Sequence, residues 1–145
     1  MAWYDDVHTS KKWRLGTVKT DVAGNKYIFL SGVASNAIGN WVVYDEDYGA
    51  TRLIADEVGP VAISMSAFDA TTDYGWAQIW GVNTVADTDT VAADKALFID
   101  GTTGRADDAD VAGDAIHGAF SMTADTSNVA TVFLSYPWVS DIDYA

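Results

Sequence analysis

Short runs of apolar and polar residues alternate along most of the chain and are separated by residues typical of turns. Such runs, rich in β-branched and aromatic residues, predict β-strands. We expect strands at 13–20, 26–31, 40–44, 51–55, 61–67, 76–82, 96–99, 115–122 and 129–136. No segment keeps a helical period over three turns, so we expect no long helix and at most a helical turn within 87–95.

The segment 61–67 has the clearest alternation of the predicted strands. Its larger side chains would face a core, because successive side chains of a strand point to opposite sides. Its small side chains would form a flat face that permits close approach of another chain. That small face consists of Ala62, Ser64 and Ser66.

The predicted strands fill nearly the whole chain, and no linker divides it. A length of 145 residues suits one domain. We therefore expect an all-β fold, a compact β-barrel or β-sandwich made by residues 13–140. Residues 1–12 would precede it as an extended N-terminal arm, and residues 141–145 would follow as a C-terminal tail.

Charge is distributed unevenly over the chain. Eight basic and 21 acidic residues give a net charge of −13, which argues against nucleic acid or an anionic membrane as partner. Five of the eight basic residues precede position 27, so a mildly basic end adjoins a strongly acidic body.

Motifs of catalysis are missing from the sequence. Cysteine is absent, and His8 and His117 lie far apart, so neither a thiolate nor a paired-histidine metal site is expected. The glycine-rich segment 101–105 lacks the spacing of a phosphate-binding loop and predicts a turn. The acidic segment 107–114 departs from the EF-hand pattern, which leaves a solvated loop or a cation site. We expect no enzyme activity, no metal and no cofactor.

Six tryptophans are the main candidates for binding. Trp76 and Trp80, with Gln78 between them, would share one face of a strand. Such a face could belong to a core, a protein interface or a sugar-stacking platform. Trp3 and Trp13 instead flank basic residues in the predicted arm, a combination suited to docking on an acidic, grooved partner.

Several segments of the chain resemble head decoration, or cement, proteins of tailed bacteriophages, which are encoded beside the major capsid gene. The resemblance rests on 13–18, 21–33, 41–45, 58–67, 74–81, 112–116 and 137–139. It implies a small β-rich virion protein without catalytic residues. Such a protein binds the outer surface of the expanded capsid and stabilises it by bridging subunits of the major capsid protein.

The resemblance also implies partners and a location. Copies would associate as trimers, with dimers as the alternative. The protein would lie on the outer capsid surface after synthesis in the bacterial host cytoplasm, which fits a start that lacks the features of a signal peptide. The expected capsid-binding residues are Trp3, Lys11, Lys12, Trp13 and Arg14.

Contacts between copies are expected at Ser64, Ser66, Trp76 and Trp80. The alternative function is a carbohydrate-binding attachment module on the phage surface. The positions of Trp76 and Trp80 distinguish the two functions. Burial or a protein contact favours decoration, whereas two rings side by side on an open face favour sugar binding.

Overall fold

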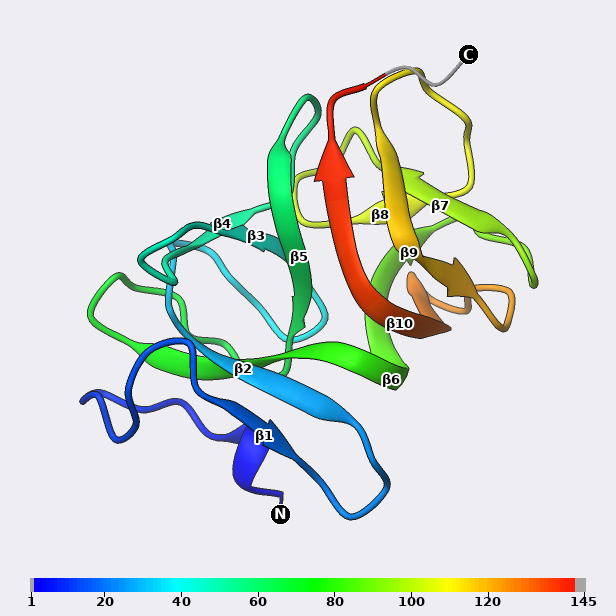
Figure 1. Ribbon diagram of the computed structural model, residues 1–145. Helices are drawn as coiled ribbons and strands as arrows, with labels where there is room; N and C mark the ends of the chain where they lie inside the picture. The colour runs from blue at the N-terminus through cyan, green and yellow to red at the C-terminus, as the bar shows by residue number, and fades with distance from the viewer. Residues whose placement is uncertain (1, 143–145) are drawn as a thin grey trace.

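The computed structural model describes residues 2–142 and is almost entirely β (Figure 1). Its single sheet contains β1 (Val18–Thr20), β2 (Lys26–Ser31), β3 (Trp41–Tyr44), β4 (Ala50–Arg52), β5 (Val58–Ser64), β6 (Tyr74–Asp89), β7 (Ala96–Ile99), β8 (Ala106–Asp107), β9 (Ala115–Ser121) and β10 (Val129–Ser140). A 3₁₀ turn, η1 (Trp3–Asp5), precedes the strands. The predicted all-β class is confirmed, and among residues 2–142 no helix is long or apolar enough to cross a membrane.

Every predicted strand overlaps an observed one, but two details differ. The two-residue strand β8 was not predicted, because it is too short to show alternation. The helical turn expected within 87–95 does not form. Its first residues extend β6 to Asp89, where they pair with β8.

The long strand β6 organises the sheet. Its first half pairs with β2 and β5, and its second half pairs with β10 and β8. The pairings β6–β8, β8–β7, β7–β9, β9–β10 and β10–β6 close a ring of five strands. The strands β1 and β4 lie at the two ends of the sheet order. Figure 1 shows β6 running beside β2 and under the lower end of β5 before it reaches the ring.

A glycine allows β6 to change partners. Gly81 has φ of 101°, and a Cβ there would collide with the side chain of Asn25. The buried amide of Gln78 spans the irregularity by donating to the carbonyls of Trp80 and Val82, each at 3.0 Å. Asn83 in turn donates to Gln78 Oε1 at 2.9 Å. The polar groups freed by the bend are thus satisfied inside the protein.

Both faces of β5 are covered, which contradicts the expected flat outer face of Ala62, Ser64 and Ser66. Val61 and Ile63 belong to the core enclosed by the ring, whereas Ala62 belongs to a second core between β2, β3 and β6. The small side chains of this strand therefore form no flat outer face. Ser64 is fully buried and donates a 3.1 Å hydrogen bond to Asn36. Alternation could not reveal this, because it describes strands with one buried face.

The extended N-terminal arm is not confirmed. Trp3, Tyr4, Trp13 and Leu15 pack on the buried rings of Tyr27, Phe29 and Trp76, which form a third cluster. His8 and Tyr74 exchange backbone hydrogen bonds of 2.8 and 2.7 Å. Large aromatic side chains bury enough apolar surface to offset the entropy of fixing a short segment. Of the predicted tail, Asp141 and Ile142 are exposed, and 143–145 lie outside the described residues.

Candidate protein-binding surfaces

Four of the five predicted capsid-binding residues line one groove. Its walls are Lys11, Lys12, Trp13, Arg14 and Leu15 on one side and Glu46, Asp47 and Tyr48 on the other, around a volume of about 480 Å³. The second wall is the turn between β3 and β4. Lys12 Nζ lies 5.9 Å from the centre of the Trp13 ring. We call this surface the basic groove.

The fifth predicted residue, Trp3, makes contacts within the chain. Its ring centroid lies 5.0 Å from that of Trp76 and 5.4 Å from that of Tyr27, both in edge-to-face geometry. Lys19 Nζ lies 4.5 Å from the Trp3 ring and 4.8 Å from the Trp13 ring. Trp3 therefore packs the N-terminal segment on the body and lies apart from the basic groove.

The four residues expected between copies do not form a common surface. Ser64, Ser66 and Trp76 are buried, and Ser66 Oγ donates a 3.2 Å hydrogen bond to the carbonyl of Asp6. Trp80 is half-buried on the outer side of the ring. Because Trp76 is 0% exposed, the two tryptophans do not lie side by side on an open face.

A surface that the sequence analysis missed surrounds Trp80. The register places Phe133 of β10 opposite Val82 of β6 and opposite Phe120 of β9. Trp80 contacts Phe133 and Tyr136 with centroid distances of 5.6 and 5.4 Å. Phe120 is 45% and Trp138 is 42% exposed. Trp138, further along β10, stacks on His117 of β9 with ring centroids 4.2 Å apart. We call this surface the aromatic face; its members are Trp80, Val82, Phe120, Phe133, Tyr136 and Trp138.

The stretches of β6, β9 and β10 that carry the aromatic face lack formal charge. None of the 21 acidic and eight basic residues falls within 74–86, 115–124 or 126–140. Depletion of charge together with enrichment of aromatic residues is typical of the core of a protein interface. These uncharged segments are visible in the sequence, but only the strand order shows that they are neighbours.

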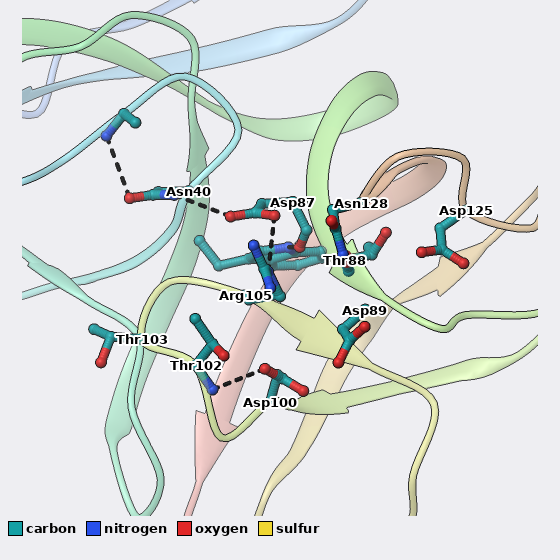
Figure 2. A network of polar contacts seen from close by, with 12 residues as sticks. Asn40, Asp87, Thr88, Asp89, Asp100, Thr102, Thr103, Arg105, Asp125 and Asn128 are labelled. Carbon is teal, nitrogen blue, oxygen red and sulfur yellow. Dashed lines mark hydrogen bonds and ion pairs between the residues drawn. The ribbon is translucent and has the colours of Figure 1, made fainter.

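A network of charged and polar side chains lies at the end of the five-stranded ring where β8 pairs with β6 and β7 (Figure 2). Arg105 and Asp87 form an ion pair at 3.0 Å, and Asn40 donates to the same carboxylate at 3.4 Å. Trp41 Nε1 donates to the Asp87 carbonyl at 3.1 Å. These contacts connect the start of β3 to β6 and to the loop before β8, so we assign them to stability.

Two carboxyl groups lie close together beside this network. Burial, reinforced by a hydrogen bond with Asp100, raises the pKa of Asp107 to about 6. Burial alone would raise the pKa of Asp100, but hydrogen bonds from the Thr102 N–H, at 2.7 Å, and from Asp107 outweigh it and lower the pKa. Below about pH 6, the proton that the two carboxyl groups share therefore resides on Asp107.

The acidic segment 107–114 is only partly solvated. Residues 109–112 are exposed, whereas Asp114 is buried and accepts a 3.3 Å hydrogen bond from the Asp56 N–H. Within the described part of the chain, no three acidic or histidine side chains are arranged to hold a metal ion.

Comparison with known proteins gives no functional information on these surfaces. No protein-family model matches the chain, and no curated protein matches it. The functional interpretation therefore depends on the basic groove, the aromatic face and the sequence resemblance.

Proposed function

We propose that this protein is a virion structural protein that decorates the outer capsid surface of a tailed bacteriophage. It would stabilise the capsid by bridging subunits of the major capsid protein. The aromatic face is the observation that carries this proposal. Six apolar side chains on uncharged stretches of β6, β9 and β10, in a chain of net charge −13, support a role in protein binding.

Bridging requires two separate contact surfaces, and the fold has two candidates. The aromatic face belongs to β6, β9 and β10, whereas the basic groove is made by the N-terminal segment and the β3–β4 turn. Repetition of both contacts over a shell would supply avidity, so each contact can be modest. The acidic charge would keep free copies soluble before assembly. The partners are the major capsid protein and neighbouring copies.

Sugar binding is the weaker alternative. It depended on Trp76 and Trp80 as an open stacking platform, and Trp76 is fully buried. Two rings flank Trp80. The planes of Phe133 and Tyr136 are inclined to the Trp80 ring by 74° and 40°, so the three rings do not form a flat platform. We therefore favour a protein partner.

The test is to heat expanded capsid shells of the cognate phage, depleted of this protein, with and without the purified protein. Added protein should bind in numbers comparable to the major capsid protein and raise the temperature of shell disruption. A double variant, Phe120→Ser with Trp138→Ser, should fold but bind at least tenfold more weakly. Val111→Ser, an exposed apolar side chain outside the aromatic face, is the matched control. Shells that neither bind the wild type nor gain stability would refute decoration.

A further inference from the structure

A second groove adjoins the basic groove. Its volume is about 510 Å³, and Asp45, Glu46 and Glu57 line it together with apolar atoms of Val43 and Pro60. We call it the acidic groove. Glu46 and Tyr48 line both grooves, so the β3–β4 turn separates two adjacent sites of opposite charge.

The charged side chains of the two grooves form no ion pair with one another, although Glu46 and Asp47 lie across the basic groove from its basic side chains. Among residues 2–142, Arg105 and Asp87 form the only ion pair. Lys11, Arg14 and Glu57 therefore remain available to charged groups of a partner. The turn between the grooves is held in place, because Asp45 Oδ1 accepts hydrogen bonds from the N–H groups of Asp47 and Gly49 at 3.0 and 2.9 Å.

Tyr48 occupies a backbone conformation that tyrosine rarely adopts. Its φ is 61°, in the left-handed region, where glycine would sit without strain. Its ring lies over Gly16, where a Cβ would come within 2.5 Å of two ring atoms. The side chain is nevertheless 36% exposed between the grooves. The partly exposed ring is therefore available to an apolar group of a partner that spans the two grooves.

We propose that the two grooves and Tyr48 form one docking site for an extended peptide segment of a partner protein. A basic end of the segment would enter the acidic groove, an acidic end would enter the basic groove, and an apolar side chain between them would pack on Tyr48. Charge complementarity at two points fixes the orientation of the segment. Both grooves are wide open to solvent, with volumes of about 510 and 480 Å³, which suits a segment that lies along the surface. Only the identity of the partner, a capsid subunit, rests on the proposed function.

Binding of designed peptides tests the site without a capsid. The probe is a nine-residue peptide with three lysines at one end, three glutamates at the other, and a leucine between two threonines. Nine extended residues span about 30 Å. In fluorescence anisotropy, this peptide should bind at least tenfold tighter than peptides with lysines at both ends or glutamates at both ends. Equal binding of the three peptides, or binding by none, would overturn the proposal.

Charge reversals locate the two ends of the peptide. Glu57→Lys and Lys12→Glu should each weaken binding at least fivefold. Asp110→Lys and Lys95→Glu make the same charge changes at exposed positions outside the grooves and should leave it unchanged. If the control variants weaken binding as much as the groove variants do, the peptide is attracted by the overall charge of the protein and the docking-site proposal is wrong.

Tyr48→Gly separates binding from folding. The variant should stay folded, because relief of the strained φ offsets part of the packing that the ring loses on Gly16, but it should weaken peptide binding at least fivefold. Ser35→Gly, at another exposed residue with positive φ of 66°, is the matched control. Undiminished peptide binding by Tyr48→Gly would exclude the ring from the site.

Shell binding distinguishes the two proposals. If the wild type binds shells and the groove variants bind equally well, decoration stands and the groove is not used on the capsid. If the wild type binds the peptide but not shells, the docking site stands and decoration fails.

Discussion

The indole of Trp3 meets the indole of Trp76 edge to face, with ring centroids 5.0 Å apart. This contact closes the third cluster, in which Tyr27, Phe29 and Trp76 are buried. The N-terminal segment is thus part of the folded body in the free protein. Removal of the N-terminal segment would expose large rings on β2 and on the first half of β6.

Trp3→Ala should therefore lower the free energy of unfolding by about 2–3 kcal/mol, below the value for a fully buried tryptophan because Trp3 is half-buried. Urea denaturation at neutral pH measures the change. Val22→Ala, at a fully exposed turn residue, should change stability by less than about 0.5 kcal/mol. Equal stability of Trp3→Ala and wild type would mean that the segment is an independent arm.

The carboxyl pair predicts a pH dependence. The pKa of Asp107 in the folded protein is about 6, against 3.8 for an unperturbed aspartate. The shared proton therefore stabilises the fold fully below about pH 4, and this contribution is lost as the pH rises through about 6. Because Asp107 is partly exposed, solvent screening reduces the loss to about 1 kcal/mol.

Asp107→Asn should remove this dependence, because an amide can donate to Asp100 at every pH. The variant should be about 1 kcal/mol more stable than wild type at pH 8 and no more stable at pH 4. Urea denaturation between pH 4 and pH 8 provides the curve. Asp110→Asn removes one charge from the same loop and should keep the wild-type slope between pH 5 and pH 7. Parallel curves for Asp107→Asn and wild type would contradict a shared proton.

The bend of β6 depends on Gly81. Gly81→Ala should destabilise the protein by about 2–4 kcal/mol, because alanine disfavours the positive φ and its Cβ would collide with Asn25. Thermal unfolding followed by circular dichroism measures the effect. Gly101→Ala is the control, since Gly101 has ordinary φ and no heavy atom within 4 Å of the added Cβ. If both variants melt together, the bend does not require glycine.

The ion pair of Asp87 with Arg105 should contribute to closure of the ring. Arg105→Ala should cost about 2 kcal/mol, because the partly buried Asp87 carboxylate would keep only Asn40 as a side-chain partner. A double-mutant cycle with Asp87→Ala should give a coupling of about 1 kcal/mol. Lys95→Ala, an exposed cation, should change stability by less than about 0.5 kcal/mol. Strictly additive effects would show that the pair contributes nothing.

Local pattern was sufficient for the strands and for the all-β class. Runs of β-branched and aromatic residues bounded by turn residues at 26–31, 96–99 and 115–122 predicted β2, β7 and β9 closely, because these are local signals of a strand. Charge counting also showed a basic N-terminal end, and Lys11, Lys12, Trp13 and Arg14 do line one groove. Neighbours in sequence remain neighbours in space, so this part of the site needed no knowledge of the fold.

Strand order decided the rest. Trp76 is buried because the N-terminal segment packs on it, and Ser64 is buried beside Asn36 of the β2–β3 loop. No single strand encodes such coverage. Phe120, Phe133 and Val82 form one face only because β9, β10 and β6 pair in that register. The proximity of the two grooves likewise depends on where the β3–β4 turn meets the N-terminal segment. These relationships join residues distant in the chain, and long-range pairing is set by the packing of the whole sheet rather than by local propensity.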